Sequence, residues 1–134
     1  MIVVDASAVC AILLAEPERP LFLETLSRLR GQTFITPVNH WEVVVRGRKW
    51  RGEDGMATAQ LLLTRLRLQL VPTDAAQTAS AIDAARRFGR GTRADLNMGD
   101  CFAYALAVSL NAPLLYKGDD FPHTDVRPAV ELST

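Results

Sequence analysis

Short apolar segments alternate with helical ones along this chain, and that alternation constrains its fold more than any other feature. The predicted strands lie at residues 1–5, 33–36, 68–73, 112–116 and 125–132. Pro128 marks the last of them as an edge strand, because proline removes a donor from the hydrogen-bond ladder. Strands that alternate with helices pair in parallel and are covered by helices on both faces. The pattern therefore predicts an α/β fold with three layers, α/β/α, around a central, mostly parallel sheet.

The segments between the strands have helical composition, with alanine and leucine in place of β-branched residues. Ser7 and Asp74 stand where a side chain can cap the first turn of a helix. The segment 97–111 is apolar on nearly every face, which is typical of a central, buried helix. The predicted helices lie at residues 6–16, 21–30, 38–50, 55–68, 74–89 and 97–111.

Composition limits the class of protein. Hydrophobic residues make up 49% of the 134 residues and charged residues 22%, as in ordinary globular proteins, so a single domain over residues 1–134 is predicted. No apolar run approaches the ~18 residues of a membrane span, and the first residues lack the basic start of a signal peptide. A cytoplasmic location without membrane contact is therefore expected.

The charges are balanced overall but clustered locally. Fifteen basic and fifteen acidic residues give zero net charge, so overall charge does not indicate a nucleic-acid-binding protein. One basic cluster lies at residues 86–93 and another surrounds Trp50. The second comprises Arg46, Arg48, Lys49 and Arg51. Each cluster is either a solvated helix end or a contact for phosphate groups, and the sequence leaves both interpretations open.

The cysteines and histidines give little support for a zinc site or a histidine-activated nucleophile. Cys10 and Cys101 lie far apart, without the paired spacing of zinc ligands. His40 and His123 are isolated in the sequence. Chemistry at this protein is therefore expected to depend on other side chains.

Four acids are hard to explain together as purely structural residues. Asp5 ends the first strand, Glu42 interrupts an apolar segment, Asp100 opens the buried helix and Asp119 follows the fourth strand. Taken singly, three of them fit a helix cap or a turn, whereas a lone buried Glu42 is costly. Strand ends and helix starts meet at one edge of a parallel sheet, so three or four of these carboxylates are expected to converge there. Asp120, beside Asp119, is assigned to the turn.

Converging carboxylates repel one another, and a divalent cation removes that repulsion. Ligands that are all oxygen select Mg2+ or Mn2+ over zinc. Such cations can activate a water and neutralise the charge that builds on a phosphodiester. The residues therefore predict magnesium-dependent phosphoryl chemistry. They do not distinguish RNA from DNA or small phosphates, or one metal ion from two.

Three stretches carry a resemblance that covers nearly the whole chain. They read IVVDASAVCAILLAEPE from residue 2, HWEVVV from residue 40 and LNMGDCFAYALAVSLNAPLLYKGDDFPHTDV from residue 96. Together they resemble the PIN-domain ribonucleases and, among these, the VapC toxins of bacterial toxin–antitoxin pairs. The resemblance implies a PIN-like α/β/α fold and a hydrolase that cleaves RNA endonucleolytically with Mg2+, or with Mn2+.

The resemblance also assigns roles to individual residues. The implied metal-binding and catalytic acids are Asp5, Glu42, Asp100 and Asp119, with Asp5 and Asp100 as principal ligands. Ser7 and Asn97 take supporting positions. The basic clusters, rather than the resemblance, supply the expected contacts to the RNA backbone: Arg46, Arg48, Lys49 and Arg51, and the segment 86–93. A cation-activated water would leave a 3′-hydroxyl and a 5′-phosphate.

Partners follow from the same resemblance: a small antitoxin that wraps the toxin and blocks the site, a homodimer, and a hetero-oligomer of toxin with antitoxin. Two alternatives stand beside the toxin interpretation. One is a catalytically silent PIN fold that serves as a binding module. The other is a receiver-like signalling domain, which would use Asp5 with Lys117 but lacks a second acid beside Asp5. The RNA target and the antitoxin's identity are not encoded in these motifs.

Overall fold

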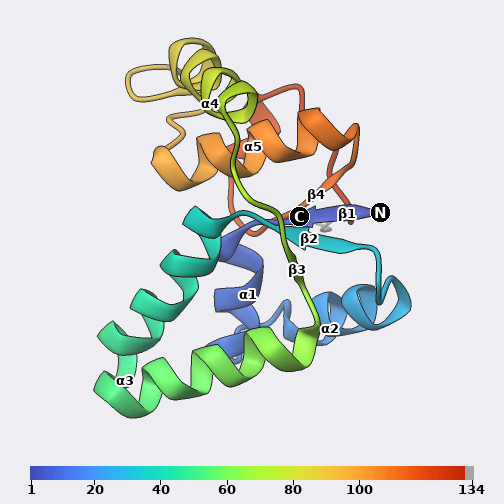
Figure 1. Ribbon diagram of the computed structural model, residues 1–134, viewed down its shortest axis with the longest axis vertical. Coiled ribbons are helices and arrows are strands. Elements are labelled where there is room, and N and C mark those ends of the chain that lie inside the picture. The colour runs from blue at the N-terminus through green and yellow to red at the C-terminus, as the bar shows by residue number, and fades with distance from the viewer. Residues whose placement is uncertain (132–134) are drawn as a thin grey trace.

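The computed structural model describes residues 1–131 and places four strands in one parallel sheet. Their order across the sheet is β3 (Gln69–Leu70), β2 (Thr33–Ile35), β1 (Ile2–Val4) and β4 (Leu114–Leu115). Helices lie on both sides of the sheet (Figure 1). The three-layer α/β/α fold predicted from the sequence is therefore confirmed, with β1 at its centre.

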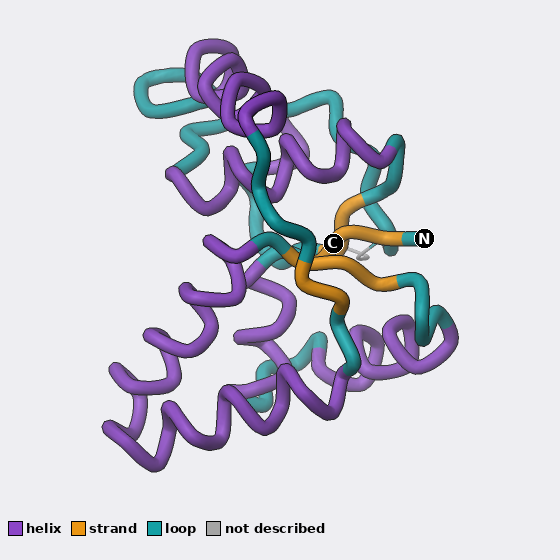
Figure 2. The backbone as a smooth tube through the Cα atoms, viewed as in Figure 1, coloured by secondary structure: helices purple, strands orange, loops and turns teal. Residues whose placement is uncertain are grey.

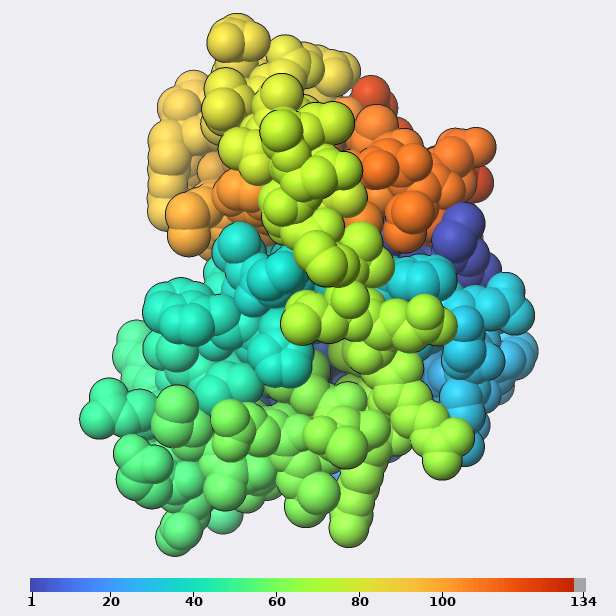
Figure 3. All heavy atoms as spheres, viewed as in Figure 1, coloured from blue at the N-terminus to red at the C-terminus, as the bar shows by residue number. Residues whose placement is uncertain are grey.

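Two groups of helices form the outer layers. One layer contains α1 (Ala6–Leu13), α2 (Arg19–Arg28) and α3 (Pro37–Leu66), and the other contains α4 (Ala75–Phe88) and α5 (Met98–Leu110). Figure 2 shows the strands as a thin middle layer between them. In the space-filling view of the same face, the yellow and orange atoms of α4 and α5 lie above the strands and the green atoms of α3 lie below (Figure 3).

The buried central strand explains why the two layers pack on one sheet. Successive side chains of a strand point to opposite faces. Ile2 and Val4 pack in the core with α1 and α3, whereas Val3 packs in the core with α5. All three are buried, which is the environment that a short β-branched run favours. None of the helices described in residues 1–131 combines the length and apolar character that a membrane crossing needs.

α3 joins the two helices that the sequence predicted at 38–50 and 55–68. Its backbone leaves helical geometry at Arg51 and at Gly52, which has a φ of +57°. The two arms fold back on each other as a hairpin (Figure 1). A Cβ on Gly47 would lie 2.5 Å from the carbonyl oxygen of Gly55, so this close approach of the arms requires glycine.

Two details of the sequence prediction are corrected. The predicted fifth strand at 125–132 is reduced, within its described residues, to a parallel bridge between Leu114 and Pro128; residue 132 lies outside them. The N-cap of α1 is Asp5 rather than Ser7, because the Asp5 carboxylate reaches the backbone of the first turn. The predicted cap of α4 by Asp74 is confirmed.

The strand order places a crevice at the carboxyl ends of β1 and β4. From β1 the chain moves to β2 and β3 on one side of the sheet, then returns through α4 and α5 to β4 on the other. Open α/β sheets bind ligands at such a reversal of strand order. Asp5 directly follows β1, so the first predicted acid lies at this point.

Candidate active site at the carboxyl ends of β1 and β4

Asp5 is a buried carboxylate that also caps a helix. Only 3% of its surface is exposed, and its Oδ2 accepts a hydrogen bond of 3.0 Å from the Ser7 backbone N–H. Burial raises the pKa of Asp5 to about 6, although the bonds from Ser7 act in the opposite direction. The nearby Glu42 carboxylate raises it further. The helix-cap interpretation is therefore correct, but it does not explain why so buried a cap should be an acid.

Asp100 lies at the start of α5 in a reciprocal capping box. Its Oδ2 accepts from the Asn97 backbone N–H at 3.0 Å, and the Asn97 Oδ1 accepts from the Asp100 N–H at 2.9 Å. Burial, and then the charge of Asp5, raise the pKa of Asp100 to about 7. Burial also raises the pKa of Glu42, to which the charge of Asp100 contributes. Three of the four predicted acids therefore affect one another's ionisation.

Asn39 contacts two of these acids and the residue before the third, and sequence reasoning did not identify it. Its side chain is fully buried, and its Nδ2 lies 2.9 Å from Glu42 Oε1, 3.0 Å from the Gly99 carbonyl and 3.5 Å from Asp5 Oδ1. An amide has two protons for these three acceptors, so the longer contact to Asp5 is the weakest. The Thr36 hydroxyl donates to Asn39 Oδ1 and fixes the orientation of the amide. Its spacing three residues before Glu42, on the same helix face, was the available signal.

Gly99 permits the close approach of α3 and α5 at the site. A Cβ on this residue would lie 2.1 Å from Glu42 Oε1 and 2.2 Å from Oε2. No rotation of an alanine methyl relieves such an overlap, so any larger residue would displace the Glu42 carboxylate. The pair GD in the sequence therefore has two functions: glycine makes room for one acid and aspartate supplies the next.

The two adjacent acids after β4 are separated by the structure. The charge of Asp120, not that of Asp119, contributes to the raised pKa of Asp100. Asp119 instead lines a cavity of about 590 Å³ together with Glu18 and Lys117. The charge of Asp120 therefore acts on the cluster, whereas the role of Asp119 as the fourth acid stays a prediction.

Ser7 supports the site through the loop after β4. Its hydroxyl accepts a hydrogen bond of 3.0 Å from the Lys117 backbone N–H. The Lys117 ammonium lies 3.0 Å from a carboxylate oxygen of both Glu16 and Glu18. Lys117 is therefore paired with the segment after α1 rather than with Asp5, which removes the main support for a receiver-like domain.

The basic residues of α3 differ in their surroundings. Arg46 and Lys49 line a cavity of about 280 Å³ together with Ser7 and Glu42. Arg48 instead lies 3.7 Å from Glu53, and the Arg51 guanidinium lies 4.1 Å from the Trp50 ring centroid. The arginines at 86, 87 and 90 form surface ion pairs with aspartates. Only Arg46 and Lys49 of the predicted RNA contacts therefore lie beside the acids.

The acids fit a divalent cation in chemistry and location. Among residues 1–131, no three side chains of histidine, cysteine, aspartate or glutamate lie in an arrangement ready to hold a metal ion. Asp5, Glu42 and Asp100 nevertheless lie close enough to raise one another's pKa, and in this part of the chain none of them has an ion-pair partner. Oxygen donors of this kind suit Mg2+ or Mn2+, and side-chain movement would complete the ligand set.

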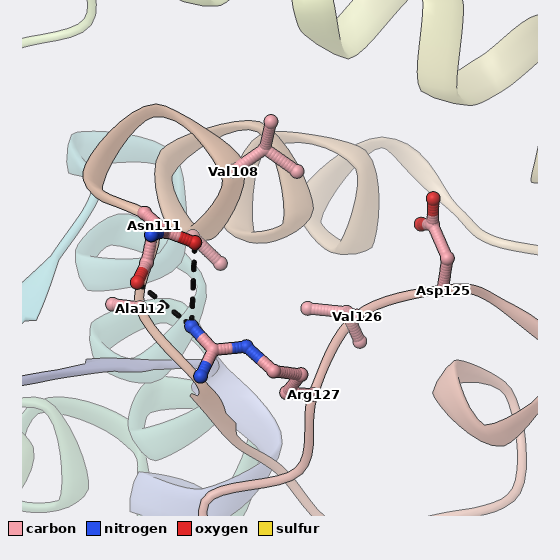
Figure 4. Close-up of a pocket in the computed structure, with 7 residues that line it drawn as sticks. Val108, Asn111, Ala112, Asp125, Val126 and Arg127 are labelled. Carbon is pink, nitrogen blue, oxygen red and sulfur yellow. Dashed lines mark hydrogen bonds between the residues drawn. The ribbon is translucent and has the colours of Figure 1, made fainter.

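A smaller cavity, of about 150 Å³, lies at the other end of α5 and has a different character. Arg127 lines it and donates to the Asn111 carbonyl at 2.7 Å (Figure 4). Asp125 lies at its margin and points away from Arg127 (Figure 4). Its carboxylate accepts hydrogen bonds from Tyr104 and Arg87, which hold its pKa below the ordinary value. Charges are paired at this end of α5, which gives no reason to expect a cation there.

Comparison with known proteins agrees with the geometry. A family model described as PIN domain matches residues 2–127. Ribonuclease VapC42 of Mycobacterium tuberculosis is 38% identical over 130 residues, which cover 95% of this chain and 98% of that protein. Ribonuclease VapC of Mycolicibacterium smegmatis is 41% identical over 125 residues, covering 92% and 96%. A chain of the solved toxin–antitoxin complex from Klebsiella pneumoniae superposes with a TM-score of 0.73 at 15% identity, covering 98% of this chain and 100% of that chain.

Proposed function

Because this chain belongs to the PIN-domain family, among the VapC ribonucleases, we propose that it is an RNA-cleaving hydrolase and the toxin of a toxin–antitoxin pair. The reaction is hydrolysis of a phosphodiester bond within an RNA strand, with a divalent cation, Mg2+ or Mn2+, as cofactor. The cognate antitoxin and a second copy of the toxin are the proposed protein partners. A solved toxin–antitoxin complex of the same fold supports the first of these.

Asp5, Glu42 and Asp100 are the residues that would hold the cation, with the fourth acid supplied by the adjacent pair Asp119 and Asp120. When bound, the cation would lower the pKa of a water and neutralise charge on the scissile phosphate. The protein itself contributes orientation: Asn39 positions Glu42, and Asn97 positions Asp100. Loss of such a supporting bond to a metal ligand typically lowers metal affinity or activity by about 10- to 100-fold.

One observation carries the proposal. Three carboxylates from three different elements are brought together in a largely desolvated crevice, where their pKa values rise and no lysine or arginine pairs with them in the described chain. A structural role would favour apolar or neutral residues at such a place, because an uncompensated buried charge is costly. A cation that is bound during catalysis would compensate the negative charge of the three carboxylates, which explains why acids stand at these positions.

The test is a cleavage assay on RNA with Mg2+, with EDTA, and with the variant Asp100→Asn. We expect EDTA to abolish cleavage and Asp100→Asn to reduce its rate by at least about 100-fold, the scale of losing one group that stabilises transition-state charge. Asp83→Asn is the matched control, since Asp83 lies on the surface in ion pairs with Arg86 and Arg87. Undiminished cleavage by Asp100→Asn would overturn the site assignment.

The inhibitory partner is tested separately. Co-expression with the open reading frame beside this one in its genome is expected to yield a complex that does not cleave RNA. Separation of the two chains by denaturation and refolding should restore cleavage to the toxin alone. Full activity of the isolated complex would contradict the proposed antitoxin.

A further inference from the structure

Trp41 is an exposed aromatic residue directly beside the acid cluster. It precedes Glu42 in α3 and exposes 60% of its surface, although tryptophan is on average among the well-buried residues. Met98, which precedes Gly99 in α5, is 63% exposed. Because Gly99 lies against Glu42, two exposed apolar residues, Trp41 and Met98, each adjoin in sequence a residue of the site.

The cavity beside Trp41 combines three kinds of group. It measures about 280 Å³ and lies between the start of α1 and the first arm of α3. Trp41 and Lys49 are eight residues apart and Glu42 and Arg46 are four apart, so helical periodicity turns all four toward one side. An aromatic face, two cations and a carboxylate of the acid cluster therefore line one recess.

We propose that this recess is a nucleotide subsite in which an unpaired RNA base stacks on Trp41 while neighbouring phosphates contact Arg46 and Lys49. The proposal rests on the proposed ribonuclease function and adds to it a residue, Trp41, that binds a base of the RNA. Base stacking needs an open aromatic face, which a paired base in a helix does not offer. Every base has such a face, so the subsite is expected to bind the strand without strong preference for one base.

The charges of the recess favour RNA over an apolar protein segment. Arg46 and Lys49 are both exposed, and no ion pair among the described residues involves either of them. An apolar partner would have to desolvate these two cations without compensation, at a cost that a phosphate avoids. Continuity with Glu42 places the bound nucleotide next to the cluster where the scissile phosphate would lie.

Fluorescence can test the subsite without relying on cleavage. Trp50 is the only other tryptophan in the sequence, so Trp50→Phe makes Trp41 the sole reporter. Combined with Asp100→Asn to prevent cleavage, this protein is titrated with a single-stranded RNA of eight nucleotides, with the same RNA as a duplex, and with an oligonucleotide of the same length made entirely of abasic nucleotides. We expect quenching of Trp41 by the single strand, and much less by the duplex or the abasic strand.

Substitution of Trp41 gives a second measurement. Trp41→Ala should weaken binding of the single-stranded RNA by about 5- to 150-fold, the scale of one base–aromatic stack, and leave binding of the abasic strand unchanged. Trp41→Phe should retain most of the affinity because it keeps an aromatic face. Leu61→Ala removes a residue that is 50% exposed on the other arm of α3 and should have no effect.

The outcomes separate this inference from the proposed function. Cleavage by the wild type, with equal quenching by intact and abasic strands and no effect of Trp41→Ala, would overturn the subsite and leave the ribonuclease intact. Trp41 quenching by the intact strand but not by the abasic strand, with no RNA cleavage by the wild type, would support the subsite and contradict the proposed ribonuclease function. A shift of Trp41 emission that depends on protein concentration, without RNA, would assign the recess to a second copy of the chain.

Discussion

The acids at the N-terminal end of α5 and the single acid Asp125, which lies against the rest of that helix, have opposite environments. At the N-terminal end, Asp100 and Asp5 are desolvated, lack a basic partner among the described residues, and have raised pKa values. Asp125 is instead exposed, accepts hydrogen bonds from Tyr104 and Arg87, and has a lowered pKa. Asp125 therefore has stabilising partners of a kind that Asp5 and Asp100 lack among the described residues.

The difference shows which charges contribute to folding and which do not. A paired, exposed carboxylate adds a small stabilisation, typically below about 1 kcal/mol. A buried carboxylate without a basic partner lowers stability whenever it is ionised, because protein dipoles replace its hydration only in part. Buried carboxylates at the crevice therefore make physical sense if a bound ligand compensates their negative charge in the functional protein.

The same substitution in both environments should give opposite results. Asp5→Asn keeps an oxygen that can cap α1 and removes the buried charge, so the free energy of unfolding at pH 7.5 without metal should rise by on the order of 2 kcal/mol. RNA cleavage should fall by at least about 100-fold. Asp125→Asn should lower the free energy of unfolding by about 1 kcal/mol, through weakened bonds to Tyr104 and Arg87, and leave cleavage unchanged.

Urea denaturation and an RNA-cleavage assay on the two purified variants provide the measurements. The contrast fails if Asp5→Asn destabilises the protein as Asp125→Asn does, because Asp5 would then be a structural cap. It also fails if Asp125→Asn loses cleavage, because the paired acid would then belong to the site.

Much of the fold could be predicted because local pattern and global architecture agree. Alternating strands and helices gave the three layers, and the apolar faces of residues 97–111 marked the buried helix. The hairpin within α3 was predicted as two helices, at 38–50 and 55–68, and the backbone leaves helical geometry between them, at Arg51 and Gly52. The fifth strand failed because a β-branched composition describes a segment's preference but not whether a partner strand is available.

The site was predictable in its chemistry but not in its detail. Acids at strand ends are visible in the sequence, and the choice between Asp119 and Asp120 is not, since the conformation of a turn decides which carboxylate faces inward. Asn39 was missed because its spacing from Glu42 is a weak signal until Asp5 and Gly99 are packed around its side chain. Gly99 was read only as part of a motif, and its closeness to Glu42 becomes apparent only when α3 and α5 are packed together.

A pH series should show the two acid environments in one protein. The folded-state pKa of Asp5 is raised to about 6 and that of Asp100 to about 7, so between pH 4 and 7 the folded state binds more protons than the unfolded state. Without metal, the free energy of unfolding should therefore fall as pH rises through this window, by on the order of 3 kcal/mol after solvent screening of Asp100. Asp125, whose pKa is lowered, should act oppositely and only below about pH 4.

Urea titrations in EDTA at four pH values from 4.5 to 7.5 would measure the fall. Asp100→Asn should flatten the part above pH 6, and Asp125→Asn should not change the slope in this range. Added Mg2+ should stabilise the protein most at the highest pH, because the cation binds the ionised carboxylates. Stability that rises with pH in EDTA would show that the acids already have partners in the folded protein.

Asn39 and Tyr104 offer a comparison of smaller effects, because each donates hydrogen bonds to acids in one of the two environments. Asn39→Ala removes the amide between Glu42 and the Gly99 carbonyl and leaves the Thr36 hydroxyl without its acceptor. The loss of these buried bonds should lower the free energy of unfolding by about 2 kcal/mol. Tyr104→Phe, which removes one hydrogen bond to Asp125, should cost about 1 kcal/mol.

Stability alone cannot assign Asn39 a role in positioning, so metal affinity supplies the second measurement. Isothermal titration with Mn2+ should show affinity reduced by about 10-fold in Asn39→Ala and unchanged in Tyr104→Phe. Asn39→Gln keeps the amide but moves it by one methylene, and should recover part of the stability and little of the affinity, because the carboxylates need the amide at one place. Equal affinity in all three variants would mean that Asn39 only fills space, and that the acids reach their positions without it.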